Sequence, residues 1–174
     1  MPFIRCNVPS KPLRICKPHQ QRPVMEKYGN TLALDCATLM GWSVAVEDKL
    51  TAYGETRLKN GERDLFQFLT DITAQYHITR IVAEGCFLDR NVRTFERLAN
   101  YHGVITLFAQ LNGLELITKG YQPTEWKRTL MGKPYATKEQ IKSYVNRLLE
   151  AHIQSDNITD SIGILLVWAK RQRR

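Results

Sequence analysis

The sequence predicts an α/β fold in which helices flank a mixed five-stranded sheet whose first three strands are antiparallel. Three observations support this class. Residues 31–58 contain three short apolar or alternating runs joined by short polar turns, which is typical of an antiparallel meander. Helical apolar spacing then alternates with two further strand-like runs, at residues 77–84 and 114–119. The 174 residues are enough for one domain with a substantial core.

The helices are predicted from the spacing of apolar residues and from residues typical of helix ends. Residues 62–75 and 92–110 carry apolar side chains at helical spacing. Pro123 occupies a favoured first-turn position of a third helix, and Thr137 with Gln140 forms a capping box that opens a fourth. The last helix is expected at residues 156–170, which gives the order βββαβαβααα. The apolar side of the helix at 92–110 is lined by Phe95, Leu98, Ala99, His102, Ile105 and Leu107.

Positive charge is concentrated at the two ends of the chain. The net charge is +8, yet the first 30 residues alone carry six Lys and Arg against one acid, and residues 170–174 carry four more basic residues. We therefore predict a basic, irregular arm at residues 1–29, a globular domain at 30–170 and a basic tail at 171–174. Such arms commonly bind phosphate backbones. A merely solubilising role is the alternative.

The cysteines favour a reducing compartment. Cys36 and Cys86 lie on elements that we expect to be buried, and the four cysteines show no CxxC spacing. A zinc site from Cys6, Cys16 and His19 is the poorly spaced alternative.

The sequence also bears on location. No apolar run approaches the ~20 residues of a membrane span, so we expect no membrane partner. The amino-terminal region lacks the apolar core of a secretory signal. We expect a cytoplasmic protein. An organelle transit peptide is the minor alternative, because the prolines of the first 23 residues disfavour an amphipathic helix.

Three apolar segments each deliver a carboxylate. Asp35 and Glu84 end strand-like runs, and Asp156 and Asp160 lie one helical turn apart at the start of the last helix. A carboxylate in an apolar strand is costly unless it is compensated, and Mg²⁺ is the usual compensation. In a basic protein, these four acids predict metal-assisted cleavage of a nucleic-acid backbone. Buried ion pairs at Asp35 and Glu84, and an ordinary helix cap at Asp156, are the alternatives.

These segments together resemble the RuvC-like Holliday junction resolvases of the RNase H-like superfamily. The resemblance covers residues 31–170 and departs from the family pattern in two places. Residues 36–40 stand where a Gly-rich turn is frequent, and the last two acids are four residues apart rather than three. Asn157 therefore competes with Asp156 for the fourth ligand position, and we favour the carboxylate. The matching motifs are residues 32–35 with Gly41 and Trp42, 83–87, 97–104, 123–127 with Gly132 and 136–141, and 156–162.

The resemblance implies an RNase H-like fold and two-metal hydrolysis of phosphodiester bonds. The expected cofactor is Mg²⁺, two ions per active site, with Mn²⁺ able to substitute. The expected substrate is branched DNA, in particular the four-way (Holliday) junction, and the expected assembly is a homodimer. The resemblance also implies the cytoplasm of a bacterial or phage-infected cell. Two alternatives remain open. One is an RNase H-like nuclease for other branched DNA or RNA–DNA hybrids, and the other is a non-catalytic nucleic-acid-binding protein, against which the intact acids count.

Basic and aromatic residues complete the expected site. Lys127 and Lys138 match lysines that the family uses near the scissile phosphate, so we count them as catalytic as well as DNA-binding. Phe87 either stacks at an opened base step or is a core residue at a strand end. Lys142 and Arg147 are assigned to a solvated helix face. The expected DNA-binding residues are Phe87, Arg90, Arg93, Lys127, Arg128, Lys133 and Lys138.

The helix at 92–110, with Phe95, His102 and Phe108, is the predicted dimer surface. Simple packing against the sheet is the alternative for this helix.

Overall fold

A computed structural model describes residues 29–86 and 91–172. Most of the predicted arm at 1–29, with the alternative zinc ligands, lies outside the described residues, and so do Phe87 and Arg90. Among the described residues, no helix is both long and apolar enough to cross a bilayer.

The observed element order is the predicted one, βββαβαβααα. The elements are β1 (Thr31–Asp35), β2 (Leu39–Val46), β3 (Lys49–Arg57), α1 (Glu62–Tyr76), β4 (Arg80–Ala83), α2 (Val92–Leu111), β5 (Glu115–Ile117), α3 (Pro123–Met131), α4 (Lys138–Leu149) and α5 (Asp156–Gln172). The sheet has the order β3-β2-β1-β4-β5. Its first three strands pair antiparallel, while β4 runs parallel to both β1 and β5. The predicted mixed five-stranded sheet is therefore confirmed.

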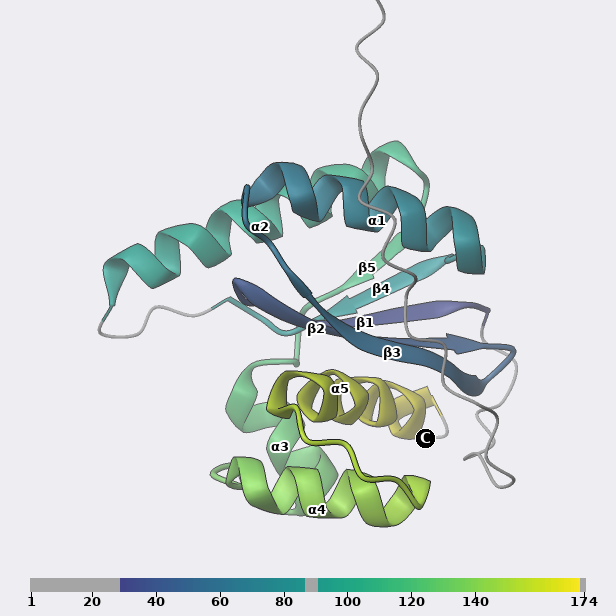
Figure 1. Cartoon of the computed structure of the whole chain (residues 1–174), viewed down its shortest axis with the longest axis vertical. Coiled ribbons are helices and arrows are strands. Elements are labelled where there is room, and N and C mark those ends of the chain that lie inside the picture. Colours follow the sequence, from purple (N-terminus) through teal and green to yellow (C-terminus); the bar gives the residue numbers. More distant parts are fainter. Residues whose placement is uncertain (1–28, 87–90, 173–174) are drawn as a thin grey trace, which may run out of the picture.

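Helices cover both faces of the sheet (Figure 1). Helices α1 and α2 lie on one face, and α5 lies on the other with α3 and α4 beyond it. Strand alternation divides β1 between two cores: Leu32 and Leu34 belong to the α1/α2 side, and Ala33 belongs to the α5 side. Asp35, two residues after Ala33, consequently faces α5. This alternation places the first candidate acid on the side where the last helix begins.

Helix α2 buries a different stripe from the predicted one. Tyr101, Ile105 and Phe108 are buried, whereas the side chain of Leu107 is 54% exposed. Ala99 and Leu107 lie on the apolar side that the sequence indicated, yet both are exposed. The spacing of the buried residues is i, i+4 and i+7, which is the true helical face toward the sheet. Leu107 and Leu111 are left on the outer side of the helix.

The carboxyl end of α5 is tied to the rest of the fold. The helix continues to Gln172, two residues past its predicted end. The Arg171 guanidinium donates a hydrogen bond to the Gly120 carbonyl at 2.7 Å and lies 4.4 Å from the centre of the Tyr121 ring. Arg171, the first residue of the predicted basic tail, therefore stabilises the turn before α3.

Candidate metal and nucleic-acid site

Two of the four candidate acids, Asp35 and Glu84, lie in one transverse row of the sheet. Asp35 on β1 is directly opposite Gly41 on β2, and Gly41 is opposite Glu55 on β3. Glu84 follows β4, and its backbone N–H donates to the Leu34 carbonyl at 3.0 Å. Because side chains in one transverse row point to the same face of a sheet, Asp35 and Glu84 project together toward α5.

Gly41 lets α5 begin directly against this row. A Cβ at this position would overlap the backbone carbonyl of Asn157. Two side-chain bonds fix the same end of the helix. The Ser43 hydroxyl donates to the Ser161 carbonyl at 3.0 Å, and the Ser155 hydroxyl donates to the Glu55 carboxylate at 2.6 Å. The absence of a side chain at residue 41 therefore brings the first turn of α5 to the acids of β1 and β4.

Asp35, Glu84 and Asp160 form an electrostatically coupled trio. Burial raises the pKa of Asp35 well above its usual range, and the charges of Glu84 and Asp160 raise it further. Burial also raises the pKa of Glu84, to which the Asp35 carboxyl is hydrogen-bonded. Burial raises the pKa of Asp160 to about 6. The charges of Glu84 and Asp160 thus disfavour ionisation of Asp35, and the charge of Glu84 disfavours ionisation of Asp160. The hydrogen bond with Asp35 has the opposite effect on Glu84, because it lowers the pKa of that carboxyl.

Asp156 behaves differently from these three acids. Its carboxylate lies 2.6 Å from the Lys142 ammonium and 3.8 Å from that of Lys138. The hydrogen bond from Lys142 lowers the pKa of Asp156. The sequence assigned Lys142 to a solvated helix face, and this assignment is wrong. Helix α4 packs beside α5, so the lysine points toward the first turn of α5. The role of Asp156 as fourth ligand stays a prediction.

Two lysines face the acidic trio. The charge of Lys127 on α3 lowers the pKa of Glu84 and Asp160, and that of Lys138 lowers the pKa of Asp35 and Asp160. Both lysines come from the segment that the sequence singled out. The structure thus brings the predicted catalytic lysines close enough to the predicted acids to interact electrostatically.

The ligand atoms of Asp35, Glu84 and Asp160 are of the chemical type that binds divalent cations. One buried carboxylate oxygen, Asp160 Oδ1, has no hydrogen-bond partner. Oxygen donors with excess negative charge are the ligand set of Mg²⁺, Mn²⁺ and Ca²⁺. Within residues 29–86 and 91–172, however, no three Asp, Glu, His or Cys side chains already converge as a cage. Binding would therefore require the hydrogen bond between Asp35 and Glu84 to give way to bonds with the cation.

This unfavourable burial predicts that Asp160→Asn stabilises the metal-free protein. The pKa of Asp160 is near 6 in the folded state against 3.8 ordinarily, so its ionisation opposes folding as the pH rises through 6, and this cost vanishes below about 4. At pH 7.5 in EDTA, we expect a gain of roughly 1–3 kcal/mol in the free energy of unfolding. Chemical denaturation measures it, with Asp71→Asn on exposed α1 as the near-neutral control. A less stable Asp160→Asn protein would contradict this reading.

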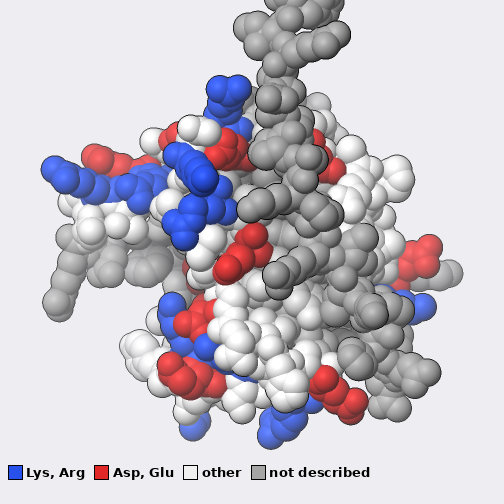
Figure 2. All heavy atoms as spheres, viewed as in Figure 1, with Lys and Arg blue, Asp and Glu red and all other residues white. Residues whose placement is uncertain are grey.

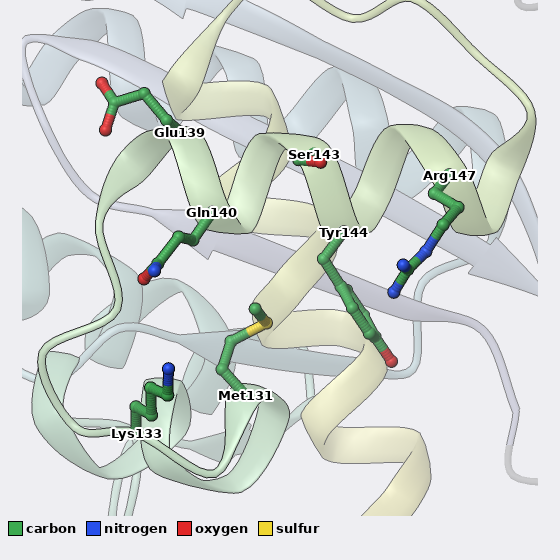
Figure 3. Close-up of a pocket in the computed structure, with 7 residues that line it drawn as sticks. All are labelled: Met131, Lys133, Glu139, Gln140, Ser143, Tyr144 and Arg147. Atoms are coloured by element: carbon green, nitrogen blue, oxygen red, sulfur yellow. The ribbon is translucent and has the colours of Figure 1, made fainter.

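The remaining predicted DNA-binding residues lie outside this centre. Arg93 on α2 and Arg128 on α3 are exposed. Lys133 lines a cavity of about 380 Å³ between the loop after α3 and the exposed side of α4, together with Tyr144 and Arg147 (Figure 3). Figure 2 shows basic and acidic side chains intermixed on the face drawn. The DNA contacts of these three residues stay predictions.

Sequence reasoning missed the partner of Glu84. The indole N–H of Trp126 donates to Glu84 Oε1 at 2.8 Å, and the ring is fully buried. The helical pattern identified Trp126 as an apolar residue of α3. A buried tryptophan usually needs an acceptor for its N–H, but the linear sequence does not show which acceptor folds against it.

Comparisons with known proteins identify related sequences over most of the globular part of the chain. The family model described as crossover junction endodeoxyribonuclease RuvC matches residues 42–168. The protein of that name from Helicobacter pylori strain 26695 is 30% identical over 120 residues, which cover 67% of this chain and 74% of the relative. The one from Brachyspira hyodysenteriae is 28% identical over 109 residues, which cover 63% of this chain and 67% of the relative. The match spans about two thirds of several such relatives.

Solved structures show the same fold. Thermus thermophilus RuvC superposes with a TM-score of 0.69 and 19% identity, over 83% of this chain and 95% of that chain. The yeast mitochondrial Holliday junction resolvase Ydc2 gives a TM-score of 0.61 at 11% identity, over 87% and 81% of the two chains. RuvC is an RNase H-like fold, so the predicted fold class is confirmed. With the family model matching well over half of its length, this chain belongs to the RuvC family of crossover junction endodeoxyribonucleases.

Proposed function

We infer that this protein is an endonuclease that cleaves four-way DNA junctions. The observation that carries the proposal is the meeting of Asp35, Glu84 and Asp160 from three separate elements, with Lys127 and Lys138 facing them. Three coupled acids beside two lysines suit a phosphodiester substrate, because the acids hold cations and the lysines balance phosphate charge. Membership of the RuvC family supports the same assignment.

The proposed cofactor is a pair of Mg²⁺ ions held by Asp35, Glu84 and Asp160, with Asp156 as the fourth ligand and Mn²⁺ able to substitute. Bound there, such ions would activate a water molecule and stabilise the leaving oxygen. The protein's own groups orient the substrate: Lys127 and Lys138 bind phosphate oxygens, and Glu84 is held in place by the Trp126 indole. Asp156 would join the site only by sharing or leaving its contact with Lys142.

The proposed substrate follows from the family. The names of the relatives describe crossover junction endonucleases, and one structural neighbour is T. thermophilus RuvC in complex with a Holliday junction substrate. Other branched DNA and RNA–DNA hybrids need the same metal chemistry and remain the alternative substrates. A non-catalytic binding protein would have no use for the unfavourable burial of three acids.

A substrate panel tests this function. The full chain is incubated with a synthetic four-way junction, a flap, a linear duplex and an RNA–DNA hybrid, each with Mg²⁺, Mn²⁺, Ca²⁺ or EDTA. We expect the junction to be cut fastest in Mg²⁺ or Mn²⁺, bound without being cut in Ca²⁺, and left intact in EDTA. If the RNA–DNA hybrid were cut faster than the junction, the alternative function, a nuclease for RNA–DNA hybrids, would be favoured instead. Full activity in EDTA would refute a metal mechanism.

Phe108, one residue of the predicted dimer surface, is buried in the core, so it cannot contact a partner. We also propose that the protein acts as a homodimer through the outer side of α2. The side chains of Leu107 and Leu111 are 54% and 70% exposed there. Phe66 of α1 is 45% exposed and packs edge-to-face with Phe108 of α2. An apolar surface of this kind marks an interaction site. A two-fold axis beside α2 would place two active sites on one junction.

The dimer proposal predicts that Leu107→Glu with Leu111→Glu weakens self-association. Two buried carboxylates at the centre of a small interface should reduce the affinity by at least about tenfold. Sedimentation equilibrium measures the change, and Leu148→Glu, at a 38% exposed position of α4, is the matched control. An unchanged dimer in the double variant would place the interface elsewhere.

A further inference from the structure

The environment of Trp126 points to a function beyond core packing. Its ring is fully buried in the cluster between α5, α3 and the sheet. Its indole nitrogen has one proton to donate and no capacity to accept. That proton is given to Glu84 Oε1 at 2.8 Å rather than to a neutral oxygen. A hydrogen bond to a charged acceptor is about twice as strong as a neutral one, so this contact orients the carboxylate.

The surrounding backbone is shaped to hold the ring in this position. A Cβ at Gly163 of α5 would lie 2.9 Å from Trp126 Cζ3. The glycine therefore allows the indole to lie directly on the helix that carries Asp160. On the α3 side, the chain is fixed by the Gly85 N–H, which donates to the Tyr121 carbonyl at 2.9 Å just after Glu84. The indole thus bridges the helix of one acid and the strand end of another.

The same ring also holds a lysine. Lys127 Nζ lies 5.4 Å from the centre of the Trp126 ring, within the range of a cation–π contact. One aromatic side chain consequently contacts an acid through its edge and a base through its face. Loss of the ring would free both groups at once.

We propose that Trp126 is a positioning residue that holds the Glu84 carboxylate, and with it Lys127, in the orientation required for divalent-ion binding. The inference rests on the proposed metal-dependent function but concerns a residue that does not itself contact metal or substrate. Outer-shell partners of metal ligands are expected to matter by about 10- to 100-fold in metal affinity or activity. Removal of the indole N–H should therefore weaken ion binding even in the absence of DNA.

The first test measures ion binding without turnover. Calorimetric titration of Mn²⁺ into the DNA-free protein should show an affinity about 10- to 100-fold lower for Trp126→Phe than for the wild type. Trp168→Phe is the matched control, because Trp168 is an equally buried indole of the same core cluster and has the Arg80 guanidinium over its ring. In a Glu84→Gln background, Trp126→Phe should cause no further loss. An equal loss of Mn²⁺ affinity in the two Trp variants would show that Trp126 only packs the core. A further loss of affinity on adding Trp126→Phe to Glu84→Gln would show the same.

The second test needs no Trp126 variant and therefore does not depend on its folding. In ¹H–¹⁵N spectra, the described chain has three indole N–H groups, those of Trp42, Trp126 and Trp168. The Trp126 resonance should shift most, both on addition of Ca²⁺ and in Glu84→Gln. A larger shift of either other indole would overturn the proposal. Ca²⁺-dependent shifts of Trp126 in a protein that cuts no junction would refute the proposed function and leave the positioning role standing.

Discussion

Asp35→Asn should abolish junction cleavage while leaving junction binding largely intact. Asp35 lies on the central strand β1. Its pKa is raised by the charges of both other acids, Glu84 and Asp160, which shows that it lies near each of them. An amide keeps the shape of the side chain but removes the charge that a divalent ion requires. We expect a loss of on the order of 10³-fold or more in single-turnover rate. Affinity should change little, because phosphate contacts come from lysines and arginines.

Glu84→Gln should behave in the same way, since Glu84 supplies the second carboxylate of the trio. Asp64→Asn is the control for an Asp-to-Asn change far from the site: its carboxylate accepts from the Asn60 N–H at the start of α1. Gel-shift affinity in Ca²⁺ and single-turnover cleavage in Mg²⁺ are measured on the same preparations. Cleavage near the wild-type rate by either site variant would remove that residue from the metal site.

Gly41→Ala should damage both folding and catalysis, although the added group is a single methyl. The methyl would overlap the Asn157 carbonyl, which is backbone and cannot rotate away as a flexible side chain could. Helix α5 must then move away from β2 and carry Asp160 with it. We expect about 1–3 kcal/mol or more of lost stability, and at least about 10²-fold slower cleavage, because a 1 Å displacement of a catalytic group is enough for that.

The control for this substitution is Gly103→Ala on α2. A Cβ at Gly103 would meet nothing within 4 Å, so alanine should preserve or raise stability by its helix preference. Chemical denaturation in EDTA compares the two variants, and cleavage at a temperature where both are folded separates displacement from unfolding. A Gly41→Ala protein of normal stability and rate would show that the close approach of α5 to β2 does not set the site.

The sequence could predict the elements and the placement of three acids near one another, because both depend on local signals. Asp35 and Glu84 stand at the ends of apolar runs, and Asp160 precedes a long apolar stretch of α5. Such patterns also predict where the acids lie, because the ends of neighbouring parallel strands meet at one edge of a sheet. The same reasoning failed for Leu107, where apolar residues occur on more than one side of α2 and the period alone does not choose between them.

Contacts between distant segments could not be predicted in this way. The pairing of Lys142 with Asp156, of Trp126 with Glu84 and of Arg171 with Gly120 each depends on how α3, α4 and α5 pack. Charge and hydropathy indicate that such groups need partners, but they do not identify the partner. The positions of the acids could therefore be predicted from the sequence, whereas the residues that contact and orient them could not.

The central claim is that Asp35, Glu84 and Asp160 hold the divalent ions that cleave DNA. Anomalous diffraction from crystals of the full chain grown with Mn²⁺ and a junction carrying uncleavable phosphates would test it most directly. We expect two Mn²⁺ peaks about 4 Å apart, bounded by these three carboxylates, with Asp35 released from Glu84 and the Trp126 indole still bound to Glu84. Mn²⁺ located elsewhere, or an undisturbed Asp35–Glu84 pair in crystals whose DNA is bound, would contradict the claim.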